Sequence, residues 1–253
     1  MVRCFSRRPS IACPPIDEDP TMVFGLFKSP ATITADNALP GRDTPLSISG
    51  VHAVDASRMQ APFPQDTQML VVAMGCYWGA ERFYWQQDGV YTTAVGFAAG
   101  FTPNPTYRES CTGDTGSTEA VLVVYRPAEV SMDQLMKLFW ENHDPTTANR
   151  QGNDVGTQYR SGVYWTTPEQ GAAVLASRDR YQAALTDGGY GPITTELAPL
   201  AEAGDGAFYY AEDEHQQYLH KNPRGYCNHG FCQVGYDAEA HGQGEARATL
   251  PDA

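Results

Sequence analysis

A short apolar segment that stops at a glycine most constrains how this chain can fold. Met69–Met74 is apolar, polar residues precede it and Gly75 follows it, which is typical of a buried strand. Residues 76–86, with Trp78 and Phe83 among their large apolar side chains, are predicted to form a helix. Glycine lets the backbone turn sharply. The sequence therefore predicts a strand that turns directly into a helix at Gly75.

Capping patterns mark two further helices. Ser131 with Gln134, and Thr167 with Pro168 and Gln170, have the spacing of capping boxes at helix starts. We predict helices at 131–143, 167–185 and 211–220, strands at 91–97, 120–125, 162–165 and 193–200, and loops at 100–116 and 144–159.

The order of these elements indicates the fold class. The first six run strand, helix, strand, strand, helix, strand, as in the split β-α-β unit of ferredoxin-like folds. We expect an α+β fold, a two-layer sandwich with a ferredoxin-like core, an irregular N-terminal arm and a long C-terminal coil. The 253 residues suit one domain with tails. We expect the arm at 1–65, with 1–21 dispensable because Met22 offers a second start, one folded domain at 66–236, and a flexible tail at 237–253.

The net charge narrows the range of partners. The chain carries a formal charge of −13. Such a protein repels phosphate backbones and anionic lipids, so nucleic acids and membrane surfaces are poor candidates. No apolar run approaches the roughly 20 residues that span a bilayer, and the N-terminal residues lack the apolar core of a secretory signal. We expect a monomer in the cytoplasm.

Cys76 is the cysteine in the most informative position. Six cysteines are too few for a disulfide scaffold in a chain of this length. At a helix start, unpaired N–H groups and the helix dipole favour a thiolate, the nucleophilic form, over a thiol. The alternative is a small buried residue at a tight turn, a common place for a free cysteine. Spacing alone does not decide between the two.

The residues around Cys76 match a known family. Gly75-Cys76-Tyr77-Trp78-Gly79 resembles the Gly-Cys-Phe-Trp-Gly signature of A-type peptide methionine sulfoxide reductases, with Tyr in place of Phe. The resemblance continues in order through residues 107–109, 113–116, 119–121, 139–145, 150–154, 156–161, 209–212, 215–219 and 225–227. One block would be weak, whereas the ordered set is specific. It implies an enzyme that reduces methionine (S)-sulfoxide, free or in peptides, to methionine and so repairs oxidised proteins.

The resemblance also implies roles for individual residues. Cys76 would attack the sulfoxide sulfur, and Glu119, Tyr107 and Tyr159 would bind the sulfoxide oxygen. A carboxyl buried among aromatic rings keeps its proton because desolvation raises its pKa, so Glu119 would act as the general acid. The alternatives are an exposed carboxylate at the start of a strand and two core tyrosines with satisfied hydroxyls.

Three further residues match the substrate side of the family's site. Tyr77 and Trp78 correspond to the aromatic pair that seats the methyl group, since aromatic faces suit a thioether. The hydroxyl that Tyr77 adds must find a partner or water. Asp154 corresponds to a loop carboxylate near the substrate, and its alternative is a solvated loop residue.

The resemblance makes Cys227 the resolving cysteine, which condenses with the sulfenic acid of Cys76 to form a disulfide. Cys232 would pass this disulfide to thioredoxin, the external reductant, and no bound cofactor is implied. The spacer between Cys227 and Cys232 is shorter than in many relatives, which leaves the relay role open. A zinc site at Cys227, His229 and Cys232 is an alternative, although the spacing is not that of a zinc knuckle.

Two other classes of protein stay open. Cys76 with a histidine such as His215 could form an acyl-transfer or hydrolase site, which needs a base close to the thiol. A binding module could dock peptides on the aromatic residues without turnover. Cys111, Cys4 and Cys13 are predicted bystanders. Turnover of a methionine sulfoxide peptide, compared with ester hydrolysis, would separate the classes.

Overall fold

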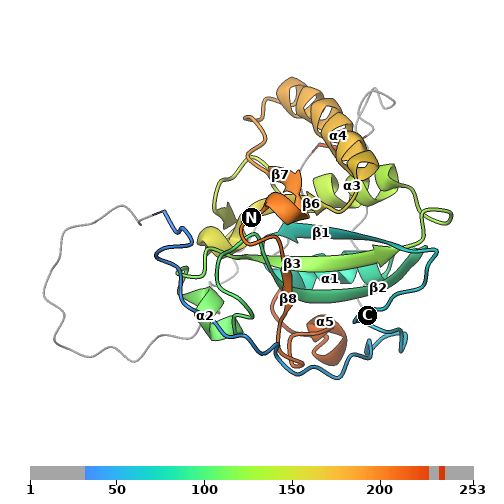
Figure 1. Cartoon of the computed structure of the whole chain (residues 1–253). Helices are drawn as coiled ribbons and strands as arrows, with labels where there is room; N and C mark the ends of the chain where they lie inside the picture. Colours follow the sequence, from blue (N-terminus) through green and yellow to red (C-terminus); the bar gives the residue numbers. More distant parts are fainter. Residues whose placement is uncertain (1–31, 228–233, 237–253) are drawn as a thin grey trace, which may run out of the picture.

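The computed structural model describes residues 32–227 and 234–236, and within them the chain is a mixed α/β fold around a six-stranded sheet (Figure 1). The strands are β1 Gln68–Met74, β2 Val90–Ala98, β3 Thr118–Tyr125, β4 Arg150–Gln151, β5 Asp154–Val155, β6 Ser161–Trp165, β7 Glu196–Pro199 and β8 Phe208–Tyr210. The helices are α1 Tyr77–Trp85, α2 Tyr107–Cys111, α3 Met132–Glu141, α4 Pro168–Asp187 and α5 Tyr218–Lys221, with short 3-10 helices η1 Thr157–Tyr159 and η2 Leu200–Glu202. No helix among the described residues is long and apolar enough to cross a membrane.

The sheet brings two predicted site residues together at the same end of its central strands. Its order is β7-β6-β1-β3-β2-β8, and β3 pairs antiparallel with both β1 and β2. Val72 of β1 lies opposite Val121 of β3. Because antiparallel strands run in opposite directions, the end of β1 that leads to Cys76 lies beside the start of β3, which carries Glu119.

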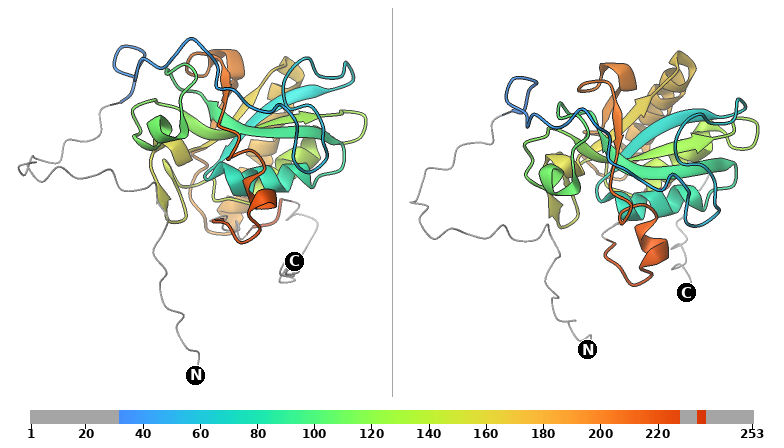
Figure 2. Two further views of the ribbon diagram at one scale, coloured as in Figure 1. Left: turned by 90° about the horizontal axis from the view of Figure 1, so that it is seen from below. Right: turned by 60° about the horizontal axis from the view of Figure 1, so that its bottom comes forward.

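The two faces of the sheet are covered differently. Side chains alternate between the faces along each strand. Leu70, Val72 and Met74 pack in one core with residues of α1, α3 and α4. Val71 and Ala73 pack in a second core, which includes residues of the arm and of the segment around η2. Figure 2 shows the arm, in blue, running along the outside of the domain past the sheet. The arm also reaches α1, where the rings of His52 and Trp85 have centroids 6.2 Å apart.

The predicted elements around the nucleophile are confirmed. β1 ends at Met74, and α1 begins at Tyr77 with Cys76 as its N-cap residue. The two predicted capping boxes are present: the side chains of Ser131 and Thr167 each accept a hydrogen bond from the backbone N–H three residues on. These helix starts are local, so the sequence alone was sufficient to place them.

The predicted helix at 211–220 is wrong over most of its length, since only Tyr218–Lys221 is helical. The side chain of Gln216 binds the backbone N–H and carbonyl of Val95 in β2, at 2.9 and 2.8 Å. Gln217 adopts a left-handed conformation with φ of 47°, which interrupts a right-handed helix. Contacts with distant residues therefore override the local preference here.

The predicted loops contain short elements. The loop at 100–116 includes α2, which begins with a capping box between Thr106 and Glu109. The loop at 144–159 includes the β4–β5 hairpin and η1. All three elements carry site residues: α2 has Tyr107, the hairpin has Asp154 and η1 has Tyr159. These loops are therefore more regular than their Gly and Asn content indicated.

The described part of the arm, residues 32–65, contains no helix or strand but is packed against the domain. The Arg42 guanidinium pairs with Glu109 of α2 at 2.7 Å, and the backbone N–H of Ser49 donates to Asp213 at 2.8 Å. Met59 is fully buried. The boundaries at 65 and 236 stay predictions, and residues 1–21 and 237–253 lie outside the described part.

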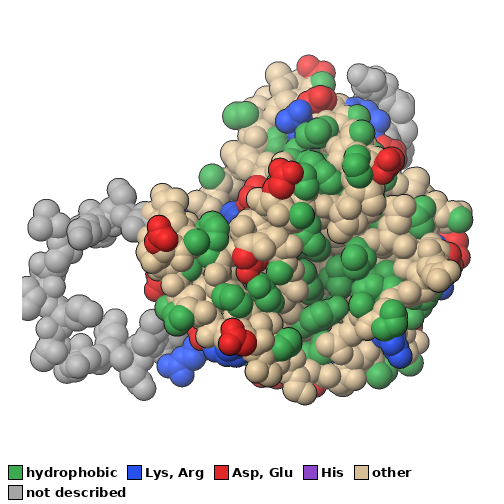
Figure 3. All heavy atoms as spheres, in the orientation of Figure 1, with side chains coloured by type: hydrophobic (Ala, Val, Ile, Leu, Met, Phe, Trp, Pro, Cys, Tyr) green, Lys and Arg blue, Asp and Glu red, His purple; other side chains and the backbone are tan. Residues whose placement is uncertain are grey.

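Charged side chains are dispersed on the surface. On the face shown in Figure 3, acidic side chains lie singly or in small groups between hydrophobic and neutral polar ones. The net charge of −13 is therefore not concentrated in one patch on this face.

Candidate active site

The junction between β1 and α1 is held in a conformation that requires glycine. Gly75 has φ of +87°, and a Cβ atom there would lie 2.5 Å from Cβ of Gln151 in β4. Any larger residue would be strained and would collide with this strand. The turn therefore packs closely against the β4–β5 hairpin, which brings Cys76 near Asp154.

A small cavity forms around Cys76. Its lining consists of Cys76, Tyr77, Trp78, Tyr107, Glu119, Asp154, Tyr159 and Tyr226. Every residue that we predicted for the attack, the oxygen and the substrate lies on this cavity, although the residues come from α1, α2, β3, β5 and η1. Tyr226 was not predicted.

Glu119 is a buried carboxyl rather than an exposed one. Its side chain is 2% exposed, and burial raises its pKa to about 8. The Tyr77 backbone N–H donates to Oε2 at 3.0 Å and opposes this rise, while the charge of Asp154 adds to it. Glu119 therefore holds a proton near neutral pH and can donate it into the cavity.

The phenols on the cavity also keep their protons. Burial, followed by the charge of Glu119, raises the pKa of both Tyr107 and Tyr159. Two protonated phenols and a protonated carboxyl therefore line the same small cavity as the Cys76 thiol. Such a set can stabilise negative charge that develops on an oxygen atom.

The expected lowering of the Cys76 pKa by the helix start is wrong. The side chain is 6% exposed, and burial raises its pKa well above the ordinary value. The charge of Glu119 adds to this rise, and the backbone N–H of Trp78 only partly opposes it. Desolvation outweighs the helix dipole because the thiol lies inside the cavity, away from water.

Asp154 is buried and paired, contrary to the alternative of a solvated loop residue. Its side chain is 6% exposed, and Oδ1 accepts a hydrogen bond of 2.8 Å from the Tyr226 hydroxyl. Tyr226 immediately precedes Cys227. This bond therefore ties the C-terminal segment to the cavity.

An aromatic stack forms one wall of the site. The Trp78 ring stacks on Tyr218 with centroids 4.0 Å apart and on His215 with centroids 5.7 Å apart. Trp78 Nε1–H donates to His215 Nδ1 at 3.3 Å. Tyr107 also contacts His215, at 4.4 Å between centroids. The wall joins α1, α2 and the segment before α5.

Sequence reasoning missed the roles of His215, Tyr218 and Tyr226 in this site. All three lie in blocks that carried the family resemblance, and this was the available signal. The sequence leaves His215 open as a base for Cys76. Its Nδ1 atom instead accepts the hydrogen bond of Trp78, and burial lowers its pKa.

The predicted resolving cysteine has an environment unlike that of Cys76. Cys227 is exposed, and the free thiols in the described part of the chain are Cys76 and Cys227. Arg82 Nη2 lies 4.0 Å from the Cys227 sulfur. Cys111 is disulfide-bonded. Cys232, His229, Cys4 and Cys13 lie outside the described residues.

Comparison with known proteins identifies relatives over most of the chain. A family model described as peptide methionine sulfoxide reductase matches residues 68–241. Peptide methionine sulfoxide reductase MsrA of Rhodospirillum centenum is 57% identical over 212 residues, which cover 83% of this chain and 94% of that protein. The corresponding protein of Synechocystis, MsrA 1, is 55% identical over 212 residues, with coverages of 83% and 93%.

A solved structure agrees with these relatives. Methionine sulfoxide reductase A of Corynebacterium diphtheriae superposes with a TM-score of 0.71 at 47% sequence identity, covering 78% of this chain and 94% of that one. Fold and site together define an enzyme that acts through a thiol. The chain belongs to the peptide methionine sulfoxide reductase family. Its activity is the thiol-dependent reduction of methionine sulfoxide.

Proposed function

We propose that the cavity around Cys76 is the site where methionine (S)-sulfoxide is reduced, with Cys76 as nucleophile and Glu119 as general acid. The observation that carries this proposal is the meeting of a buried thiol, a carboxyl with a pKa of about 8 and protonated phenols on one small cavity. The A-type family assignment supports the S epimer and both free and peptide-bound substrates.

The first half-reaction transfers one oxygen atom. The Cys76 sulfur forms a bond to the sulfoxide sulfur, and Glu119 protonates the sulfoxide oxygen. The S–O bond of the substrate then breaks and the hydroxyl passes to the Cys76 sulfur, while the new S–S bond breaks and releases methionine. The substrate gains two electrons and becomes methionine, while the Cys76 thiol loses two and becomes a sulfenic acid. The proton of the Cys76 thiol passes to the Glu119 carboxylate as the S–S bond forms, so the raised pKa of Cys76 does not prevent the reaction.

Tyr107 and Tyr159 assist by donating hydrogen bonds to the same oxygen, since their raised pKa values keep both phenols protonated. Tyr77 and Trp78 seat the methyl group, and Asp154 contributes to substrate binding. The cavity lining supports these roles because it contains all five residues.

The second half-reaction restores the thiol. Cys227 attacks the sulfenic sulfur of Cys76, a disulfide forms and water leaves. Two thiols of thioredoxin then reduce the disulfide, with Cys232 as the intermediate relay, and no bound cofactor takes part. The hydrogen bond between Tyr226 and Asp154 supports the role of Cys227, because it holds the neighbouring residue at the cavity.

We also propose that the central strands form the ferredoxin-like split β-α-β core. The antiparallel order β6-β1-β3-β2 with α1 and α3 as connections supports this arrangement. The single domain at 66–236, the monomeric state and the cytoplasmic location stay predictions from the sequence.

A coupled assay tests the function. The enzyme is incubated with NADPH, thioredoxin, thioredoxin reductase and separate S and R epimers of a methionine sulfoxide peptide. We expect NADPH oxidation and methionine formation with the S epimer. Methionine formed once per enzyme without NADPH oxidation would overturn the thioredoxin step alone. Ester hydrolysis, or binding without methionine formation, would overturn the proposed reaction.

A further inference from the structure

A buried carboxylate that the proposed reaction does not use lies on α1. The Glu81 side chain is 0% exposed and does not line the cavity. It follows Trp78 by three residues, so both side chains lie on the same side of the helix, one turn apart. A buried carboxyl far from the reacting atoms needs a physical reason to be there.

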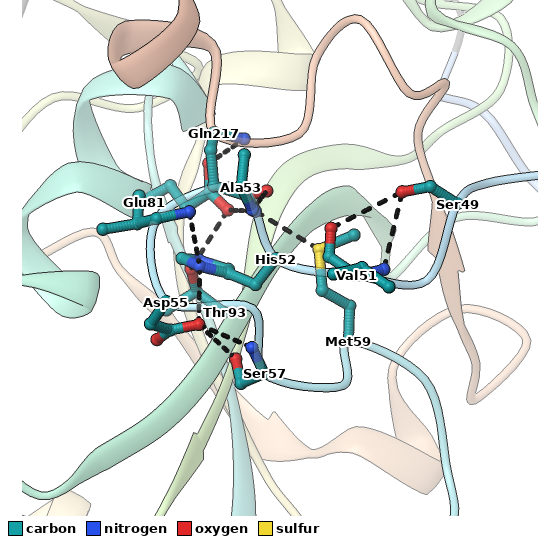
Figure 4. Close-up of polar contacts among 11 residues, drawn as sticks. Ser49, Val51, His52, Ala53, Asp55, Ser57, Met59, Glu81, Thr93 and Gln217 are labelled. Atoms are coloured by element: carbon teal, nitrogen blue, oxygen red, sulfur yellow. Dashed lines mark hydrogen bonds and ion pairs between the residues drawn. The ribbon is translucent and has the colours of Figure 1, made fainter.

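Three hydrogen bonds satisfy the Glu81 carboxylate (Figure 4). Gln217 donates twice, from its backbone N–H to Oε2 at 2.9 Å and from Nε2 to Oε1 at 2.7 Å. The Thr93 hydroxyl donates to Oε1 at 3.0 Å. Burial raises the pKa of Glu81 to about 7, and the donors from Gln217 and Thr93 oppose this rise. Gln217 is therefore the main partner of this carboxylate.

Gln217 is itself fixed in a strained conformation. Its φ of 47° lies in the left-handed region, which is unfavourable for a residue with a side chain, so contacts must hold it there. Besides the two bonds to Glu81, its Oε1 accepts a hydrogen bond from the Ala53 backbone N–H at 3.0 Å (Figure 4). The residue is fully buried. The hydrogen bonds that link Glu81, Gln217 and the Ala53 N–H form a clamp. This clamp joins α1, the arm and the segment before α5.

The residues on either side of the Glu81–Gln217 clamp pack against Trp78, which lines the active-site cavity. Tyr218 follows Gln217 directly, and His215 precedes it by two residues. Both rings stack on Trp78, with interplanar angles of 19° and 11°. Helix α1 therefore holds one short segment at two points, through the ring of Trp78 and through the carboxylate of Glu81.

We propose that Glu81 is a positioning residue for the methyl-binding wall. It fixes Gln217, and through Gln217 it sets the rings of His215 and Tyr218 that orient Trp78. The inference rests on the proposed role of Trp78 in seating the substrate methyl group. Without the clamp, the chemical groups around Cys76 stay in place, while the wall that binds substrate loses its alignment.

The variant Glu81→Gln breaks the clamp with little change in shape. Whichever way the new amide is turned, its nitrogen faces a donor of Gln217, either Nε2 or the backbone N–H, so two donors oppose each other. Turning the Gln217 amide removes this conflict but places its nitrogen against the Ala53 N–H. One hydrogen bond is lost in either case. We expect about a 5-fold rise in the half-saturating sulfoxide concentration, comparable to one neutral hydrogen bond.

The exchange Glu81→Gln with Gln217→Glu should restore the clamp at constant charge. The amide introduced at position 81 can accept from the backbone N–H at position 217 and donate to the new carboxylate, which also accepts from the Ala53 N–H. Thr93 can then donate to Nε2 of His52, which lies 3.1 Å away. Gln217→Glu alone places two carboxylates together and should resemble Glu81→Gln.

The measurement is single-turnover methionine formation at increasing concentrations of a methionine sulfoxide peptide. A burst titration of Cys76 gives the active fraction of each preparation. We expect Glu81→Gln to raise the half-saturating concentration with the limiting rate within about 2-fold of wild type, and the exchange variant to return it. A lower active fraction with an unchanged half-saturating concentration would overturn the proposal. It would show that Glu81 contributes only to the stability of the fold.

The variant Trp78→Leu keeps the test separate from the proposed function. If Trp78→Leu raises the half-saturating concentration and Glu81→Gln does not, the positioning role is overturned and the proposed site stands. If Trp78→Leu has no effect, the methyl-binding role of Trp78 is overturned, and with it the positioning role of Glu81, which rests on it. The exchange variant gives a further test if its burst shows a full active fraction. A half-saturating concentration that stays raised in this variant would also overturn the clamp.

Discussion

The two free thiols of the described chain lie in opposite surroundings. Cys76 is 6% exposed at the junction of a central strand and a helix, and burial raises its pKa well above the ordinary value. Cys227 is exposed, and the Arg82 guanidinium lies 4.0 Å from its sulfur. Each has a tyrosine beside it, Tyr77 after the first and Tyr226 before the second.

This difference fits the order of the proposed steps. Oxygen transfer needs protonated donors and an absence of water, which a buried cavity provides. Disulfide exchange needs a thiol that a second protein can reach, which an exposed residue provides. The contrast predicts that loss of the Cys76 thiol stops the first half-reaction and that loss of the Cys227 thiol stops only the second.

The largest effect should come from Cys76→Ser. Serine is a far weaker nucleophile toward sulfur, so we expect no detectable methionine even in a single turnover. Circular dichroism and thermal unfolding provide the control for an intact fold. Methionine formation within severalfold of wild type would show that another residue is the nucleophile.

The variant Cys227→Ser should separate the two half-reactions. We expect one methionine per enzyme at the normal rate, a sulfenic acid retained on Cys76, and no steady turnover with thioredoxin. A sulfenic-acid probe with mass spectrometry measures the trapped species. Cys232→Ser is the matched comparison and should retain more turnover. Normal turnover of Cys227→Ser would assign the resolving role to another cysteine.

A smaller effect is expected from Glu119→Gln, which retains the size of the side chain and an acceptor for the Tyr77 N–H. We expect the first half-reaction to slow by about 10²-fold, near the lower end for general acid catalysis, because Gln still donates a hydrogen bond. The neutral acid is present below its pKa of about 8. The wild-type rate should therefore lose this contribution above pH 8, relative to the variant.

Rates of single turnover between pH 6 and pH 10 provide the measurement, with the ratio of wild type to Glu119→Gln as the quantity of interest. The pH dependence of Cys76 alkylation is measured in both proteins as well, because the charge of Glu119 also raises the pKa of Cys76 and the substitution removes that contribution. A ratio that stays constant across this range would show that Glu119 is not the acid.

The smallest effects concern the two tyrosines, and they should have opposite signs. The Tyr77 hydroxyl is buried without a hydrogen-bond partner among the described residues, whereas the Tyr226 hydroxyl donates to Asp154 at 2.8 Å. Removing an unsatisfied buried hydroxyl stabilises a protein by about 1–3 kcal/mol, and removing a satisfied one costs about 1 kcal/mol.

Thermal unfolding of Tyr77→Phe and Tyr226→Phe measures this difference. We expect the midpoint to rise by a few degrees for the first and to fall for the second. Tyr77→Phe should also retain the methyl seat, because Phe keeps the ring. A fall in midpoint for Tyr77→Phe would show that its hydroxyl is satisfied, by water or by another group.

The sequence predicted the local features of the fold well. The strand before Gly75, the helix after Cys76 and the capping boxes at Ser131 and Thr167 all depend on neighbours within a few residues. The helix predicted at 211–220 failed because Gln216 and Gln217 bind residues more than a hundred positions away. Such contacts leave no periodic signal in the sequence.

The sequence by itself determined the family, the reaction and which side chains could take part, because ordered motifs preserve the chemistry that each side chain can perform. The tertiary structure decided the pKa values of these side chains. Burial between the sheet and the β4–β5 hairpin raises the pKa of Cys76 and of Glu119, where the helix start alone predicted a lower value for the thiol. It also brought His215, Tyr218 and Tyr226 to the site, since desolvation and stacking arise only when distant segments meet.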